Sequence, residues 1–160
     1  MSSPLVVLTL VAALGCGLAA GFFFAFSICV MPALGRLPAA QSVQAMQTIN
    51  IVVINPLFMT ALFGTALVCL ATIVAALADW DASYGPYVVA GGAVYLLGVI
   101  AVTMGANVPR NNALAGLDPA GAEAAGYWPR YLAEWTAWNH VRTVVPLIAS
   151  GLFIIGLYAA

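Results

Sequence analysis

Charged side chains are scarce in this sequence, and lysine is absent. The 160 residues carry four arginines, five acidic residues and one histidine, so that 6% are charged and 64% are hydrophobic. In a soluble domain about a quarter of the residues are charged. This composition excludes a soluble enzyme, a disordered chain and a coiled coil, and the net charge of −1 gives no attraction for nucleic acid. We therefore expect one integral membrane domain, residues 1–160, surrounded by the lipid bilayer.

Motifs of metal and cofactor chemistry are also missing. The cysteines Cys16, Cys29 and Cys69 form no CxxC pair and fall in apolar runs, which is typical of small packing residues. A single histidine without nearby carboxylates does not complete a zinc or copper site. The sequence has no glycine loop for a nucleotide and no GxSxG motif for hydrolysis. We expect no metal and no cofactor, with a haem between two copies of His140 across a two-fold axis as a remote alternative.

Charge-free runs predict four membrane spans. Such runs cover residues 1–35, 37–78, 82–109 and 143–160, and a helix needs about 20 apolar residues to cross a hydrocarbon core. We place the spans at residues 5–31, 51–78, 84–106 and 141–159. The runs are continuously apolar rather than alternating, which favours helices over the strands of a membrane barrel. The predicted fold is all-α, a four-transmembrane-helix bundle whose first span is a retained helix and not a signal peptide.

Four spans place the two longer connections, 32–50 and 107–140, on one face of the membrane. All four arginines fall on or beside these connections, whereas the short connection with Asp79 and Asp81 has no basic residue. The positive-inside rule then predicts a multi-pass protein of the plasma (inner) membrane, with the longer connections in the cytoplasm and both termini outside. We interpret Asp79 and Asp81 as solvated turn residues.

We expect a short amphipathic helix in each longer connection. In the first, a helix follows Pro38 and carries polar side chains on one face. In the second, five residues follow one another at intervals of 3, 4, 3 and 4 and form one helical stripe, and a helix of this kind commonly lies in the membrane interface. The stripe consists of Trp128, Tyr131, Trp135, Trp138 and Arg142.

Small residues mark the seams between helices. Gly17 and Gly21 form a GxxxG pattern, and Gly91, Gly98 and Gly105 recur every seven residues. Small side chains let membrane helices approach closely, either inside one bundle or between subunits. The pattern fits both cases, and we predict a homo-oligomer packed through these seams.

Polar side chains gather at the membrane face of the longer connections. Buried amides in hydrocarbon are costly unless they are paired, so we expect a hydrogen-bonded cluster that ties helices together, caps them or binds a ligand. Ionisable residues at a span are functional candidates by default. The imidazole of His140 suits a base near neutral pH, and the guanidinium of Arg142 suits a fixed cation for an anionic oxygen. The cluster comprises Asn50, Asn55, Asn107, Asn111, Asn139, His140 and Arg142.

Several stretches of the sequence resemble the DUF1772, or anthrone oxygenase-like, family of membrane proteins. The resemblance extends over nearly the whole chain, and the motifs are specific in combination rather than singly. Arg110 departs from the leucine of the form NVPLN and adds charge at the mouth of the bundle. The stretches are 24–27 (FAFS), 31–34 (MPAL), 46–50 (MQTIN), 54–58 (INPLF), 107–111 (NVPRN) and 128–142, which ends in NHVR.

The resemblance implies a cofactor-free oxygenase of a lipophilic aromatic substrate, since fungal relatives are assigned to the oxidation of anthrones to anthraquinones with molecular oxygen. Removal of a ring methylene proton leaves an anion that reacts with oxygen without metal or flavin. Such an enzyme needs an apolar slot, a base and donors for the oxyanion. We assign the base to His140 and the donors to Asn107, Asn139 and Arg142. The substrate-binding candidates are Trp128, Tyr131, Trp135, Trp138, Asn111, Asn50 and Asn55.

An alternative belongs to a different functional class. Most bacterial relatives have no assigned role, so the chain is also consistent with a non-catalytic membrane module. Such a module binds a lipid or a quinone-like molecule, or assembles with a membrane partner. In both cases we predict that Asn107, Asn139, His140 and Arg142 converge on one pocket walled by the aromatic stripe.

Overall fold

The computed structural model describes residues 1–78, 80 and 82–160, and these residues form helices and short connections. Four helical segments are long and apolar enough to cross a membrane: Ser3–Leu34, Pro56–Leu77, Gly85–Ala115 and Ala122–Tyr158. The predicted all-α bundle of four transmembrane helices is therefore confirmed, and the chain is a multi-pass membrane protein. Asp79 and Asp81, interpreted above as solvated turn residues, lie outside the described residues.

Three of the spans are series of helical elements. The first comprises α1 (Ser3–Ala25), η1 (Phe26–Val30) and α2 (Met31–Leu34), and the second comprises α4 (Pro56–Met59), η2 (Thr60–Gly64) and α5 (Thr65–Leu77). The third comprises α6 (Gly85–Tyr95), η3 (Leu96–Ala101), η4 (Thr103–Asn107) and α7 (Val108–Ala115). The fourth is one helix, α8 (Ala122–Tyr158), and α3 (Ala39–Val52) lies in the first longer connection. The η elements are π-helical turns, which are frequent at functional sites.

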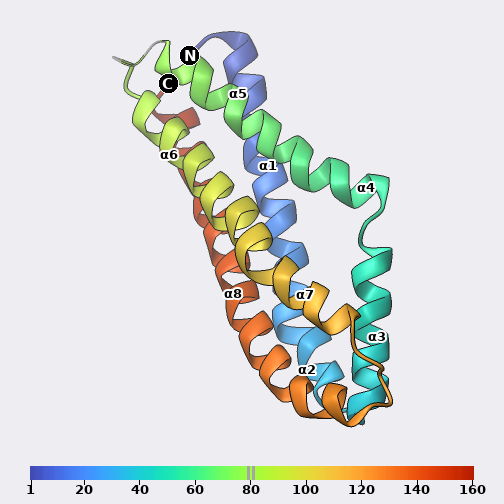
Figure 1. The fold of residues 1–160 in the computed structure, drawn as a ribbon. Helices are drawn as coiled ribbons and strands as arrows, with labels where there is room; N and C mark the ends of the chain where they lie inside the picture. Colours follow the sequence, from blue (N-terminus) through green and yellow to red (C-terminus); the bar gives the residue numbers. More distant parts are fainter. Residues whose placement is uncertain (79, 81) are drawn as a thin grey trace.

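The long helices run along one another, with α1 against α8 and α6 between α5 and α8 in the packing order (Figure 1). Both termini lie at one end of the bundle, where the hydroxyl of Ser83 donates to the carbonyl of Ala159. The connections that follow α2 and α7 lie at the opposite end, together with α3 (Figure 1). The two connections between spans that we expected on one face therefore do share one end of the molecule.

The second of these connections is shorter than predicted. Helix α7 continues to Ala115 and α8 begins at Ala122, so only residues 116–121 separate them. The aromatic stripe consequently lies on the first turns of α8, continuous with the last span, and not on a separate helix in the membrane interface. Its residues Trp128, Tyr131 and Trp135 are buried in a cluster with side chains of α2 and α3. With 37 residues, α8 is about 55 Å long, nearly twice a hydrocarbon core of about 30 Å.

The first connection contains the helix that we expected after Pro38. Its polar side chains Gln41, Gln44 and Thr48 are exposed, whereas Val43 and Met46 on the other face are buried. The amphipathic pattern therefore places α3 over the bundle with its apolar face inward.

The break between α3 and α4 is stabilised by Asn55. Its Oδ1 accepts a hydrogen bond from the backbone N–H of Phe58 at 3.0 Å, and its Nδ2 donates to the carbonyl of Val52 at 3.0 Å. Pro56 has no N–H of its own to donate. Asn55 thus acts as the helix cap of α4 and satisfies backbone groups that the proline leaves without partners.

The glycine repeat of the third span packs against α8 within the same chain. A Cβ atom at Gly98 would lie 2.0 Å from Cγ1 of Val145, and one at Gly91 would lie 3.3 Å from the ring of Phe153. At Gly105 a Cβ atom would meet nothing within 4 Å. Gly91 and Gly98 therefore form a seam inside one bundle, and the homo-oligomer stays a prediction.

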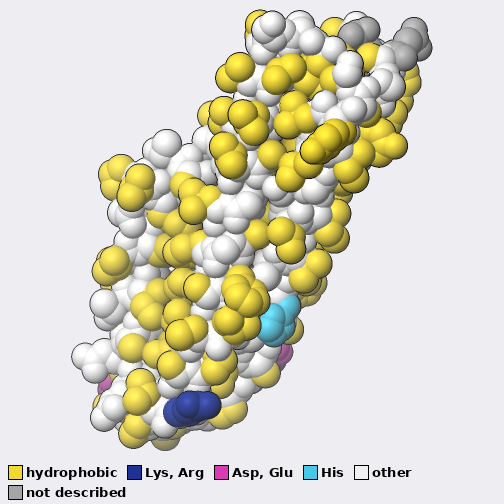
Figure 2. Space-filling view, turned by 180° about the vertical axis from the view of Figure 1, so that it is seen from behind, with side chains coloured by type: hydrophobic (Ala, Val, Ile, Leu, Met, Phe, Trp, Pro, Cys, Tyr) yellow, Lys and Arg dark blue, Asp and Glu magenta, His cyan; other side chains and the backbone are white. Residues whose placement is uncertain are grey.

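Two hydrophobic clusters fill the interior, one toward each end. The cluster nearer the termini joins α1, α5, α6 and α8, and the other joins α2, α3, α7 and the first turns of α8. The outer surface is largely apolar (Figure 2). Buried polar side chains lie where the two clusters meet, each at most 5% exposed: Ser27, Asn107, Asn139 and Arg142.

Candidate functional site

Arg142 is a buried cation held between two aromatic rings. Its guanidinium carbon lies 4.4 Å from the centre of the Phe23 ring and 4.9 Å from that of Trp135. Nη2 donates to Oδ1 of Asn139 at 2.8 Å, and Nη1 donates to the Thr103 hydroxyl at 3.3 Å. The aromatic faces stabilise the positive charge, and the hydrogen bonds fix the plane of the group.

No acidic side chain neutralises this charge within the described part of the chain. The ion pairs there join Glu134 to Arg110 at 2.9 Å and to Arg130 at 2.8 Å, and they link α7 to α8 and one turn of α8 to the next. The Nε atom of Arg142 is buried and has no hydrogen-bond partner. A buried charge is costly unless it is paired and hydrogen-bonded. Arg142 is therefore equipped to pair with an anionic or strongly accepting atom of a ligand.

Asn139 joins Arg142 to the first span. Its Nδ2 donates to the carbonyl of Phe23 at 2.7 Å and to the hydroxyl of Ser27 at 2.8 Å, while its Oδ1 accepts from Arg142. The Ser27 hydroxyl also lies 3.3 Å from that of Thr143, which donates to the carbonyl of Asn139. Every polar atom of the Asn139 amide is thus in use, and the network ties the guanidinium to the first span through α1 and η1.

An apolar cavity of about 240 Å³ lies beside Arg142. It is bounded by all four spans and by α3, and the π-helical turns η1, η2 and η4 each contribute side chains to it. Its polar lining consists of Asn50, Thr103, Asn111 and Arg142. The rest of the lining is aromatic, aliphatic or methionine: Phe22, Phe23, Phe26, Met46, Ile49, Val53, Ile54, Phe58, Met59, Leu62, Phe63, Met104, Val108 and Trp135.

Side-chain amides line the part of the cavity nearer α3 and α7. Asn111 Oδ1 accepts from the hydroxyl of Tyr131 at 2.9 Å and from the indole N–H of Trp135 at 2.8 Å. Asn50 Nδ2 is buried and has no hydrogen-bond partner. An adjoining opening of about 590 Å³ shares Asn50 and Asn111 with the cavity and adds Gln47 and Asn112. The cavity is thus polar at this opening and cationic at Arg142.

Much of the cavity lining falls in a segment that matches a known protein family. The profile described as anthrone oxygenase matches residues 56–152, more than half of the chain. This chain belongs to the anthrone oxygenase family. No curated protein and no solved structure matches it. The matched stretch supplies Thr103, Asn111, Trp135 and Arg142 to the cavity, while Phe23 precedes it.

Asn107 lies next to the cavity in this member of the anthrone oxygenase family. It is 1% exposed, and its Nδ2 donates to the carbonyl of Trp135 at 3.2 Å. Its Oδ1 is buried without a hydrogen-bond partner. Three of the four residues that we assigned to catalysis, Asn107, Asn139 and Arg142, therefore lie in one buried polar layer.

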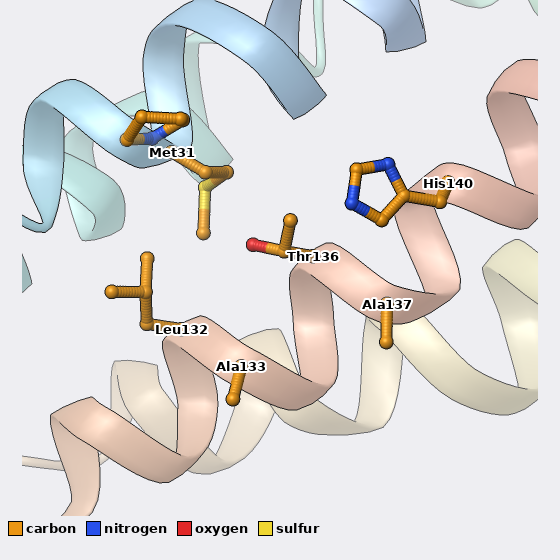
Figure 3. A pocket seen from close by; sticks show the side chains of 7 residues that line it. Met31, Leu132, Ala133, Thr136, Ala137 and His140 are labelled. Carbon is orange, nitrogen blue, oxygen red and sulfur yellow. The ribbon is translucent and has the colours of Figure 1, made fainter.

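His140 does not reach this layer, and the predicted convergence needs correction. Its side chain is exposed and lines a separate groove of about 360 Å³ between α2 and α8, with Met31, Leu132 and Thr136 (Figure 3). It is visible on the outer surface in Figure 2. At 3.6 residues per turn, His140 lies about 160° around α8 from Arg142, so the two side chains point to opposite faces. We therefore withdraw His140 as the base.

Only part of the aromatic stripe reaches the cavity. Trp135 lines it, whereas Trp128 and Tyr131 are buried in the cluster below, with the Trp128 and Tyr131 rings stacked at 5.6 Å. Trp138 is 41% exposed. The inner face of α8 continues from Trp135 to Asn139 and Arg142, so the stripe that we drew through Trp138 diverges from the buried face at that residue.

Asn55 lies outside the cavity, and two residues that contact Arg142 were not predicted. Asn55 caps α4 and lines a neighbouring hollow rather than the cavity. Phe23 and Thr103 contact Arg142 directly, and the sequence analysis did not single out either for that role. Thr103 lies four residues before Asn107, a spacing that places both on one helix face, so the sequence did contain a signal for Thr103.

Among the described residues, no group of three or more histidine, cysteine or acidic side chains lies close enough to hold a metal ion.

Proposed function

We propose that this chain is a membrane oxygenase that converts a lipophilic anthrone-like ring system to the corresponding quinone with molecular oxygen. The observation that carries the proposal is Arg142, a buried arginine that lines an apolar cavity and has no acidic partner among the described residues. An anthrone is flat and apolar, and it becomes an anion with negative charge on its oxygen when the ring methylene loses a proton. A fixed cation in an apolar cavity stabilises that charge as it develops.

The reaction divides into four balanced steps. The methylene carbon loses a proton to give the delocalised anion, whose oxygen pairs with Arg142. The anion adds dioxygen at the same carbon and forms a carbon–oxygen bond, giving a peroxide anion. This anion takes up one proton to become a hydroperoxide. Loss of the remaining methylene hydrogen as a proton, with cleavage of the O–O bond, releases water and leaves a carbonyl, so one anthrone and one dioxygen give one quinone and one water.

Arg142 and its neighbours supply the electrostatic part of this chemistry. Asn139 and Thr103 orient the guanidinium through hydrogen bonds and hold it at the wall of the cavity. Phe23 and Trp135 cover the guanidinium and shield its charge from water. A donor that is already oriented stabilises the transition state without reorganising during the reaction, and one such donor is typically worth about 10²–10³ in turnover.

The proton acceptor in this proposal is water at the amide-lined opening. Among the residues that the structure describes, the cavity lining contains no carboxylate, imidazole or phenol. Asn50 and Asn111 lie in both the cavity and the adjoining opening, so water held by these amides is next to the substrate. In this arrangement Arg142 makes the methylene more acidic by stabilising the anion, and a strong protein base is not required.

The same lining favours a second candidate function. A cavity with an unpaired cation, two amides and no titratable base also suits a quinone-like ligand whose carbonyl oxygens accept hydrogen bonds. In that case the chain binds a lipophilic ligand in the membrane without converting it. Arg142 and the amides then contact the two ends of the bound molecule.

The deciding experiment uses the purified chain in lipid nanodiscs with an anthrone under isotopically heavy dioxygen. We expect the quinone to form faster than in empty nanodiscs, and its new carbonyl to carry the heavy isotope. Arg142→Lys tests the role of the guanidinium in the same assay. Saturable quinone binding without any acceleration would reject the oxygenase and support the binding function, and no binding would reject both.

A further inference from the structure

A second hollow adjoins the cavity on the outer side of the bundle. It measures about 350 Å³ and lies between α1 and the start of the second span. Leu18 and Leu57 on its rim are 64% and 83% exposed, and Ala19 and Ala61 line its walls. Because α1 and α4–η2 belong to helices that are long and apolar enough to cross a membrane, the hollow opens to the lipid and not to water.

Four side chains line both this hollow and the cavity and separate the two spaces: Phe22, Phe23, Phe58 and Leu62. Phe23 and Leu62 are buried, whereas Phe22 of α1 and Phe58 of α4 contact each other, with ring centres 4.6 Å apart and planes tilted by 44°. Both side chains are half-buried. Phe58 lies on a helix of four residues, with the break at Asn55 on one side and the π-helical turn η2 on the other. Rotation of these rings would connect the two spaces without moving a long helix.

The two openings of the cavity differ in chemistry. The opening toward α3 and α7 presents the amides of Gln47, Asn50, Asn111 and Asn112. The outer hollow presents aliphatic and aromatic side chains, with Asn55 as its single polar lining residue. An uncharged ring system dissolved among acyl chains loses no hydration when it enters an apolar hollow, whereas at the other opening it would have to displace water from the side-chain amides.

From this arrangement we propose that an uncharged, flat aromatic ligand enters the cavity laterally from the lipid, through the hollow between α1 and α4–η2. Phe22 and Phe58 are the partition that it displaces. This entrance rests on the proposed function, because the cavity is the binding site in both cases and the entrance is the route to it. It also assigns the outer hollow a role that is separate from the chemistry at Arg142.

The route is tested by narrowing the hollow without touching the cavity. Ala19 and Ala61 line the hollow from its two walls, and neither lines the cavity. Ala19→Leu and Ala61→Leu are made separately, so that the loss of one variant to misfolding leaves the other. Ala71 on α5 is exposed and lines neither space, so Ala71→Leu is the matched control for added volume on a lipid-facing helix.

The measurement is the exchange of a dihydroxyanthraquinone probe in phosphatidylcholine vesicles, followed as quenching of tryptophan fluorescence by stopped flow. Trp135 lines the cavity, and a Trp135→Phe variant identifies its share of the signal. We expect Ala19→Leu and Ala61→Leu to slow association and dissociation by the same factor, about tenfold or more, so that the Kd is unchanged. Ala71→Leu should exchange like the parent chain.

The outcomes separate the route from the function. Unchanged exchange rates in both folded hollow variants would overturn the lateral entrance, whether or not the chain oxidises an anthrone. Slowed exchange together with absent turnover would support the entrance and reject the oxygenase. A probe that does not quench Trp135 in the parent chain would reject the cavity as a binding site, and the entrance with it.

Discussion

At the scale of single residues, the molecule retains a costly group in its interior. Arg142 is surrounded by Phe23, Trp135 and two polar side chains, with no acidic partner among the described residues. A hydrophobic residue of similar volume would avoid the desolvation of a charge. The cost is explained when a ligand supplies the opposite charge, which connects the burial of Arg142 to its proposed function.

We predict that Arg142→Lys lowers anthrone oxidation by about 10²-fold or more, because the ammonium is a compact point charge and loses the fixed planar fork. Arg142→Gln removes the charge and keeps an amide within reach of Asn139. It should lower turnover at least as much, while the thermal midpoint in nanodiscs does not fall. If both variants melted earlier but kept full turnover per folded molecule, Arg142 would be a structural residue and the proposed function would lose its main support.

His140 provides the contrasting case, because its side chain lies on the outer face of α8. We predict that His140→Ala leaves quinone formation unchanged and alters the free energy of unfolding by less than about 0.5 kcal/mol, as is usual for surface substitutions. The pH–rate profile should also be unaltered. A general base is worth about 10²–10⁴ in rate, so a loss of that size would return His140 to the site and contradict the cavity assigned here.

At the scale of helices, charge-free runs predicted four spans, and helical spacing predicted α3 and the aromatic stripe. The stripe was expected on a separate helix, however, and its end was misplaced. Residues 138 and 139 are neighbours in sequence, and only Asn139 faces the bundle. The choice between them depends on contacts with Phe23 and Ser27, which precede Asn139 by more than 100 residues. Such distant contacts leave no signal in the local pattern, which is why His140 was grouped with Arg142.

The seam between the third span and α8 gives a prediction at this scale. A Cβ atom at Gly98 would lie 2.0 Å from Val145 Cγ1 and 2.7 Å from its Cβ. We therefore expect Gly98→Ala to lower the free energy of unfolding by about 1–3 kcal/mol through overpacking. Adding Val145→Ala to that variant should recover part of the loss, because it removes the nearest methyl group.

Gly105→Ala is the control, since it is in the same span and a Cβ atom there would meet nothing within 4 Å. It should unfold like the parent chain or slightly later, in keeping with the higher helix propensity of alanine. Thermal unfolding of the variants in one lipid composition provides the comparison. Equal stability of Gly98→Ala and Gly105→Ala would show that the third span does not pack against α8 as described.

At the scale of the whole molecule, the distribution of polar groups separates two ends. Both termini and Ser83 share one end, and the connections after α2 and α7 share the other. Composition and charge-free runs were sufficient to predict this division, because the number of spans alone decides which connections and termini share an end. The cavity required more, since its walls come from every span and from α3. The sequence placed several of its polar residues near one face but contained no measure of the space between them.

This division predicts how the chain lies in the membrane. Arg36, Arg110 and Arg130 belong to the end with the two connections, so the positive-inside rule directs that end to the cytoplasm and the termini outward. We expect a cysteine at Ser83 to react with a membrane-impermeant maleimide added to intact cells, and a cysteine at Ala120 to react only after the cells are opened.

Cys29 is exposed on the helix surface, so both variants are made in a chain that carries Cys29→Ala. That chain without either new cysteine measures the background labelling. Labelling of Ala120→Cys in intact cells, without labelling of Ser83→Cys, would reverse the orientation. The lateral entrance and the cavity would stand, but the amide-lined opening would then face the outside.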